Sequence, residues 1–365
     1  MTSALAGTIE TAPRTANKSS REFGLDILRI VSICGVVAIH VFGYLIGRAP
    51  RGSRSWLVAV IIDIGFVWVV PVFVMISGAL ILGSRMATES PARFYRRRAL
   101  RLVPAIIAWH LIYLIGVRIW MRGEELPLPR ILQMLVDGSV FTQLYFLWLI
   151  AGLYLVAPVL GAFLRGGGRG RAAIAAASFL TAALVYYSIP GILGLLGISR
   201  PIHLNFLTHW MPYVGYFLAG YALRGVRLSG ARLAVAALAT LCLIGQLIWQ
   251  YAHKGQFPAL DAVLPVSYVG LGVALAALGT FTVTLSFATK LAPVRTAPLV
   301  LALSNAAFGV FLVHLVVFEA IRLNWPAVAV GKSFPVIFVA FAATLACSFG
   351  ISLLARRVPV LRRIF

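Results

Sequence analysis

Residues 24–46 read GLDILRIVSICGVVAIHVFGYLI, an apolar run interrupted by only two charged side chains, Asp26 and Arg29. The run has about the ~20 residues of one membrane-spanning helix, and it exceeds the ~7–15 apolar residues of a signal-peptide core. No convincing small-residue cleavage site follows it, so we interpret it as an uncleaved transmembrane span.

Composition extends this interpretation to the whole chain. Of the 365 residues, 61% are hydrophobic and 12% are charged, whereas soluble proteins carry about 25% charged residues. The mean hydropathy of +0.95 is too apolar for a globular core with a wetted surface. The sequence therefore predicts an all-α, polytopic membrane protein with about ten transmembrane helices. We expect them at about residues 25–46, 56–82, 101–120, 141–164, 172–188, 205–223, 232–252, 264–288, 298–320 and 334–355.

The positions of the basic residues predict the orientation. With the N-terminus inside, the cytoplasmic segments hold 21 of the 32 Lys and Arg residues, the external segments hold ten, and Arg29 lies within a span. Cytoplasmic loops of membrane proteins carry such an excess of positive charge. We therefore expect both termini in the cytoplasm and a multi-pass protein of the cell (cytoplasmic) membrane, with the lipid bilayer as its partner. This distribution explains the net charge of +22 without nucleic acid.

The chain divides into a disordered cytoplasmic tail at residues 1–22, a transmembrane domain at 23–356 and a basic cytoplasmic C-terminal tail at 357–365. An odd number of cysteines, all within apolar runs, argues against a disulfide framework or a thiolate metal site. These cysteines are Cys34, Cys242 and Cys347.

Two polar residues of the first span, Arg29 and His40, stand eleven positions apart. Eleven steps of about 100° return within roughly 20°, so both side chains share one helix face, about 16 Å apart along the axis. That separation suits the two ends of one substrate path. The alternative is an arginine that reaches towards the membrane surface and a hydrogen-bonded structural histidine. The spacing alone does not decide between them.

The second span carries Asp63, at a depth that could match that of His40. A carboxylate there could orient the imidazole, as in general-base catalysis. A helix-packing hydrogen bond, or an ion pair with an external arginine, is the alternative. For His110, His314 and Glu319 a structural role is favoured over a catalytic one, and no histidine spacing indicates a metal site.

The loop at residues 83–101 contains six basic residues and one acidic residue, Glu89. Anchoring at the cytoplasmic surface explains part of this cluster. Arginine also recognises phosphate groups with two parallel hydrogen bonds. The cluster is thus equally compatible with a cytosolic phosphorylated ligand such as a nucleotide or coenzyme A.

Five short motifs occur in chain order: Arg29-x10-His40, FVMISG at 73–78, RALRLVP at 98–104, FLWLIAGLYLVAP at 146–158 and FGVFLVH at 308–314. Each is weak alone. Together they resemble the motifs of acyltransferase family 3, integral membrane proteins that include O-acetyltransferases modifying surface polysaccharides. The resemblance covers about residues 22–355.

This resemblance implies an acyl-CoA donor, expected to be acetyl-CoA, on the cytoplasmic side. It also implies a hydroxyl acceptor, often a carbohydrate of the cell envelope, reached from outside. Combined with the depths of the polar residues, it assigns the coenzyme A phosphates to Arg98 and Arg101 and the pantetheine arm to Ser77.

Arg29 would then stabilise the thioester end, and His40 would act as general base with Asp63 orienting it. A relay in which His40 itself carries the acyl group stays open. No metal is expected, and a separate extracellular partner protein is possible.

Two other classes compete with the enzyme. In a transporter or flippase for an envelope precursor, the same polar residues would line a permeation path. The third hypothesis is a scaffold protein of an envelope assembly that has no catalytic activity.

Overall fold

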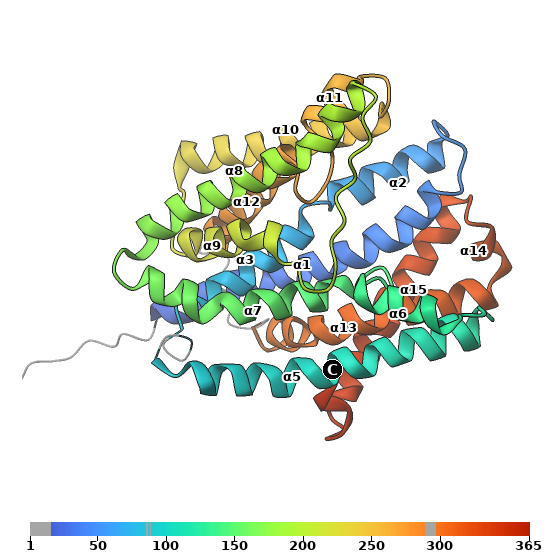
Figure 1. Ribbon diagram of the computed structural model, residues 1–365, viewed down its shortest axis with the longest axis horizontal. Coiled ribbons are helices and arrows are strands. Elements are labelled where there is room, and N and C mark those ends of the chain that lie inside the picture. Colours follow the sequence, from blue (N-terminus) through green and yellow to red (C-terminus); the bar gives the residue numbers. More distant parts are fainter. Residues whose placement is uncertain (1–15, 85–86, 88, 289–296) are drawn as a thin grey trace, which may run out of the picture.

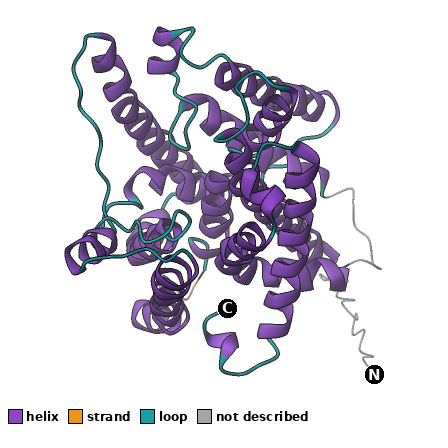
Figure 2. Cartoon of the chain, turned by 90° about the vertical axis from the view of Figure 1, so that its right-hand side faces the viewer, coloured by secondary structure: helices purple, strands orange, loops and turns teal. Residues whose placement is uncertain are grey.

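The computed structural model describes residues 16–84, 87, 89–288 and 297–365, and this part of the chain is built from helices and loops without strands (Figure 2). The predicted all-helical class is therefore confirmed. The longer helices are α1 (Ala16–Ile46), α2 (Arg54–Gly65), α3 (Val69–Ile81), α5 (Pro91–Leu111), α7 (Tyr145–Leu164), α8 (Gly168–Leu195), α9 (Val214–Leu223), α10 (Gly230–Ala252), α12 (Leu271–Phe287), α13 (Ala297–Asn324) and α15 (Phe334–Ala355). The shorter ones are α6 (Leu128–Val136), α11 (Pro258–Val263), α14 (Pro326–Val330) and the 3₁₀ turns η2 (Met211–Tyr213) and η3 (Leu361–Arg363). A π-helix, η1 (Ile112–Met121), continues α5.

Within the described residues, eight helical segments are long and apolar enough to cross a membrane. They correspond to α1, α2 with α3, α5 with η1, α7, α8, α10, α13 and α15. The other two predicted spans, 205–223 and 264–288, contain the shorter helices α9 and α12. Eight of the ten expected spans are thus candidate membrane-spanning helices, and the other two regions hold helices that are shorter than a full span.

Local sequence explains why these two helices are short. Pro212 and the turn at Asn205 keep the first half of the span at 205–223 out of the α-helix, so α9 begins only at Val214. Pro265 and the turn that ends at Gly270 delay α12 in the same way. A broken helix is tolerated at membrane depth where protein covers it. α9 meets this condition, because it is almost entirely buried and packs against α3 and α8.

Helix α1 runs through the middle of the bundle (Figure 1). It packs against α2, α3, α12, α13 and α15. The outer helices instead expose large apolar side chains, such as Leu100, Ile107, Leu111 and Ile115 along α5 and η1. Exposed apolar faces of this kind belong against lipid tails. The bilayer therefore surrounds a bundle with α1 inside it.

The span predicted at 56–82 is two helices, since α2 ends at Gly65 and α3 begins at Val69. α3 then approaches α9 closely enough for backbones to touch. A methyl group at Gly78 would lie 1.8 Å from the backbone oxygen of Phe217, and one at Gly220 would lie 1.9 Å from that of Met75. Glycine at both positions permits the contact that holds α3 in place.

Most of the tail predicted at residues 1–22 falls outside the described residues, and the described part, from Ala16, belongs to α1. The C-terminal residues fold back onto α5. There the indole nitrogen of Trp109 donates a 2.8 Å hydrogen bond to the backbone oxygen of Ile364, and the Phe365 ring packs on the same tryptophan.

Candidate active site

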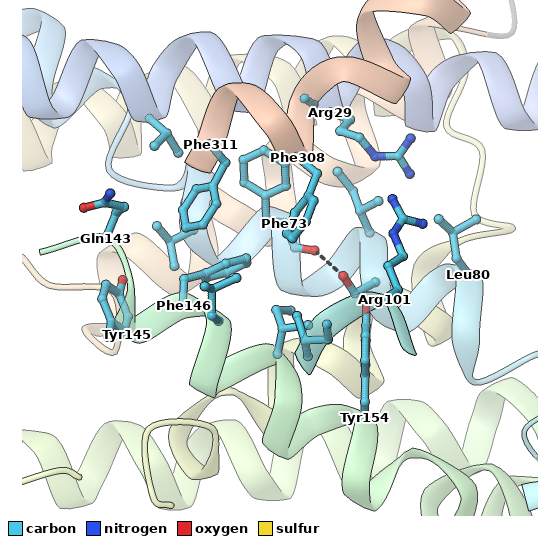
Figure 3. Close-up of a pocket in the computed structure, with 18 of the residues that line it drawn as sticks. Arg29, Phe73, Leu80, Arg101, Gln143, Tyr145, Phe146, Tyr154, Phe308 and Phe311 are labelled. Carbon is cyan, nitrogen blue, oxygen red and sulfur yellow. Dashed lines mark hydrogen bonds between the residues drawn. The ribbon is translucent and has the colours of Figure 1, made fainter. Parts of the chain in front are cut away.

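A cavity of about 440 Å³ lies between α1, α3, α5, α7 and α13. Five of the six predicted site residues line it, namely Arg29, His40, Ser77, Arg98 and Arg101. Aromatic side chains form much of the remaining wall, and we call this space the aromatic cavity. In Figure 3, Arg29 and Arg101 lie at one end and Gln143 and Tyr145 at the other, with Phe73, Phe146, Phe308 and Phe311 between them. Residues from distant parts of the sequence thus form one elongated site.

Arg29 is held in this cavity by two partners. Its Nη1 donates to the Asp26 carboxylate at 3.0 Å and to the Ser304 hydroxyl at 2.6 Å. The Ser304 hydroxyl in turn donates to the same Asp26 oxygen at 2.6 Å. The guanidinium therefore has a counter-ion and a fixed direction, and it keeps further N–H donors for a ligand.

Arg98 and Arg101 are held by aromatic faces rather than by carboxylates. The guanidinium carbon of Arg98 lies 4.9 Å from the centre of the Tyr154 ring. That of Arg101 lies 5.8 Å from the centre of the Phe308 ring. A cation stacked on a ring keeps its in-plane N–H groups available for phosphate or carboxylate oxygens.

Ser77 lies on α3 and lines the cavity. Its hydroxyl donates a 3.1 Å hydrogen bond to the backbone oxygen of Phe73, one turn earlier. Its oxygen can still accept a hydrogen bond from a ligand.

His40 lies beside a second histidine. The ring of His314, from α13, is centred 5.2 Å from the His40 ring. Nδ1 of His314 lies 2.8 Å from the backbone oxygen of Phe311, which makes it the donor, and Nε2 has no partner among the described residues. The His40 ring itself makes no hydrogen bond within the described part of the chain. Its nitrogens are therefore free to act on a ligand.

Asp63 is the one predicted site residue that does not line this cavity. Its carboxylate makes no hydrogen bond to His40 and lines neither this cavity nor the one described below, as far as the described residues show. A Cβ atom at Gly43 would lie 4.0 Å from Asp63 Oδ1. Because α2 presents Asp63 to α1 near Gly43, the carboxylate faces α1 about one turn beyond the imidazole. His314 is the side chain that contacts His40 instead.

A second cavity, of about 850 Å³, opens at the opposite end of α1. It is lined by Arg48, Arg118, Arg122 and Arg322, and we call it the arginine cavity. Three residues line both cavities: His40, Thr142 and Tyr145. The imidazole thus stands where two spaces from opposite ends of the bundle meet.

Two other polar residues noted in the sequence have structural partners. His110 Nδ1 lies 2.7 Å from the backbone oxygen of Ile106, and its Nε2 accepts a 3.0 Å hydrogen bond from Trp148. Glu319 binds two arginines, with Arg122 Nε 2.6 Å from its carboxylate and Arg322 Nε at 2.9 Å. Both nitrogens of His110 are therefore occupied, while Glu319 shapes the arginine cavity.

Comparison with known families identifies the family of this chain. The family model described as an acyltransferase domain, acyltransferase 3, matches residues 22–353, nearly the whole chain. The chain belongs to the acyltransferase 3 family. No curated protein and no solved structure gives a significant match.

In this acyltransferase, the motifs that carried the resemblance gather around the two cavities. Arg29 and His40 line the aromatic cavity together, as their shared helix face predicts, and Arg98 and Arg101 reach it from α5. Among the described residues, no group of three or more His, Cys, Asp or Glu side chains is arranged to hold a metal ion.

Sequence reasoning missed three residues of the site. Asp26 precedes Arg29 by three positions, so their i,i+3 spacing was a signal for the ion pair that forms. Tyr154 lies within a family motif, but nothing local indicated that it would lie under Arg98. Ser304 carried no signal, since its contact with Asp26 and Arg29 depends on how α13 packs against α1.

Proposed function

We propose that this membrane acyltransferase moves an acyl group, acetyl in the first instance, from cytosolic acyl-CoA to a hydroxyl acceptor. The expected acceptor is a sugar of a cell-envelope glycan or glycolipid, and the expected location is the cytoplasmic membrane with both termini inside. The observation that carries this proposal is the position of His40 at the junction of two cavities. A donor and an acceptor that enter these two cavities from opposite sides meet at this junction.

The aromatic cavity is suited to a coenzyme A thioester. Arg98 and Arg101 offer N–H donors at its far end for the phosphates. The cavity then continues between phenylalanine rings towards His40, about 16 Å from Arg29 along α1. An apolar, narrow path of this kind fits a pantetheine arm, and Ser77 can accept one of its amide hydrogens. Arg29 lies at the same end as Arg101 (Figure 3), so in this scheme it adds positive charge beside the entering chain and does not reach the thioester, where the sequence analysis placed it.

The chemistry follows from the free nitrogens of His40. One of them takes the proton of the acceptor hydroxyl while the hydroxyl oxygen attacks the thioester carbon. The carbon–sulfur bond breaks as the new carbon–oxygen bond forms, and the thiolate of coenzyme A receives the proton from His40. The products are the O-acylated acceptor and free coenzyme A. His314 keeps the His40 ring in place, and Asp63 has no part in this scheme.

The same two cavities would also suit a transporter or flippase whose path passes His40. Donor binding separates the two functions. We would measure acetyl-CoA binding, with free coenzyme A for comparison, to the purified full-length protein in lipid nanodiscs. The variants are Arg98→Ala/Arg101→Ala and, as a matched control, Arg93→Ala/Arg96→Ala, which removes two positive charges of α5 that do not line the cavity.

We expect saturable binding that falls at least tenfold in the Arg98/Arg101 variant and stays unchanged in the control. Equal loss in both variants would show that the arginines of α5 act only through a general electrostatic attraction. Absence of binding to the wild-type protein would refute the proposal and favour the transporter. Acyl-enzyme trapped with radiolabelled acetyl-CoA, and lost in a His40 variant, would indicate the histidine relay.

A further inference from the structure

The arginine cavity carries more positive charge than its own carboxylates neutralise. Four arginines line it, against two carboxylates, Asp137 and Glu319. Glu124, just outside the lining, pairs with Arg118 through an Nη2–Oε2 distance of 2.7 Å. Even with Glu124 included, one positive charge remains in excess. A ligand in this cavity therefore meets a positive field.

The arginines differ in how far their donors are used. Arg118 already has several partners, since besides Glu124 it donates to the backbone oxygen of Val140 at 3.2 Å. Arg122 and Arg322 share the carboxylate of Glu319, which is almost completely buried, and Arg122 also pairs with Glu124 at 3.4 Å. These three guanidinium groups thus face two carboxylates, and one net positive charge remains among them at the cavity wall.

Arg48 is the arginine without a charged partner. Its guanidinium carbon lies 4.4 Å from the centre of the Tyr44 ring, and it makes no hydrogen bond or ion pair with any other described residue. All five of its N–H donors are available. An arginine that is stacked on a tyrosine and otherwise unpaired can bind an anion with two parallel hydrogen bonds, that is, as a bidentate donor.

The π-helix η1 explains how Arg122 reaches this wall. Nine positions separate Tyr113 and Arg122, so an α-helix of 100° per residue would put them on opposite faces. A π-helix turns by roughly 80° per residue because its hydrogen bonds run i→i+5, which returns both to one face. Both in fact contact Phe141: the Tyr113 ring stacks on it at 4.5 Å, and the Arg122 guanidinium carbon lies 5.0 Å from its centre.

π-helical segments frequently occur at functional sites. Here the segment ends in the bond from Arg122 N to the backbone oxygen of Val117, of 3.0 Å, which has the i→i+5 pattern. The π-helix thus contributes lining residues to the arginine cavity and none to the aromatic cavity.

We propose that the arginine cavity is the acceptor site and that the acceptor is anionic, with a phosphate or carboxylate that Arg48 binds. This inference rests on the proposed function, which places the reacting hydroxyl at His40. Arg48 follows His40 by eight positions, a rise of about 12 Å along the chain direction. The acceptor therefore carries its negative group about a disaccharide's length from the hydroxyl that is acylated. A sugar phosphate, a sugar acid and a lipid headgroup phosphate all provide this chemistry.

The test uses purified full-length protein in phosphatidylcholine nanodiscs, with glucose 1-phosphate, glucuronic acid and neutral glucose as probes. The variants are Arg48→Gln, Arg48→Lys and, as a control from the same end of the bundle, Arg54→Gln, which does not line the cavity. A second arm replaces part of the lipid by phosphatidylglycerol and measures thermal stabilisation, which identifies a lipid phosphate as the source of the anion.

We expect the anionic sugars to bind at least tenfold more tightly than glucose, with binding weakened at least fivefold in Arg48→Gln, largely kept in Arg48→Lys and unchanged in Arg54→Gln. Stabilisation by phosphatidylglycerol that depends on Arg48, without sugar binding, also supports an anionic site and assigns it to lipid. Equal binding of glucose, binding that is indifferent to Arg48, or no response to any anionic probe would overturn the inference. Acetyl-CoA binding in the same samples separates the two proposals, because its failure refutes the donor site and not the anion site.

Discussion

Replacement of His40 by glutamine should remove activity without unfolding the protein. The ring makes no hydrogen bond within the described part of the chain, and its one ring contact is with His314, at 5.2 Å between centres. Losing one such contact costs about 1 kcal/mol of the free energy of unfolding. Losing a general base lowers the rate about 10²–10⁴-fold, which corresponds to about 3–5 kcal/mol of transition-state stabilisation. The effect on the rate therefore exceeds the effect on stability several-fold.

The matched variant is His314→Gln. Nδ1 of His314 donates to the backbone oxygen of Phe311 at 2.8 Å, and the residue is completely buried. Losing this hydrogen bond at a completely buried position, and burying an amide that lacks its full set of partners, costs about 1–3 kcal/mol. We therefore expect His314→Gln to lower the thermal unfolding temperature more than His40→Gln does, and to reduce activity less.

The assay follows radiolabel from acetyl-CoA into the glycan and lipid fractions of membranes that contain each variant, with membranes lacking the protein as background. Unfolding temperatures are measured on the same purified proteins. The reasoning is refuted if His40→Gln transfers label within threefold of the wild type. It is also refuted if the loss of transfer follows a parallel loss of folded protein.

Two further variants test how the site is held in place. Gly78→Ala should destabilise the protein by about 1–3 kcal/mol or more, because the added methyl group would lie 1.8 Å from the Phe217 backbone oxygen; an unfolding temperature equal to the wild type would show that α3 and α9 can separate freely. Asp26→Asn should cost about 1–2 kcal/mol, since Arg29 loses a charged hydrogen-bond partner at 3.0 Å whose partial exposure reduces its value. If Asp26→Asn unfolds at the same temperature as the wild type, the hydrogen bond from Arg29 to Ser304 is enough to hold Arg29 in place.

Much of the fold could be predicted because the signal is local. A run of about 20 apolar residues is long enough to cross the hydrocarbon core of a bilayer. Lipid tails cannot form hydrogen bonds with the backbone, so such a run forms a helix, in which its N–H and C=O groups pair with one another. The prediction fails in part at 205–223 and 264–288, where Pro212 and Pro265 shorten the helices. Both prolines are visible in the sequence, but only the packing of α9 against α3 shows how such a short helix is accommodated.

Some features of the candidate site could also be predicted from the sequence, and others could not. Helix periodicity alone put Arg29 and His40 on one face, and both indeed line the aromatic cavity. The same reasoning assigned Asp63 to His40 by depth and did not single out His314 as its neighbour. Depth in a membrane is one coordinate, and it says nothing about which helix lies beside which.

The amino-acid sequence is enough to predict a helical membrane protein, the shared face of Arg29 and His40 on its first helix, and the motifs of its family. The packed bundle is needed to see that His40 lines two cavities, that His314 lies against it, and that Arg48 has no charged partner among the described residues. The reason is that a helix face is set by residues a few positions apart, whereas a cavity is set by the side chains of several helices that meet only when the bundle packs.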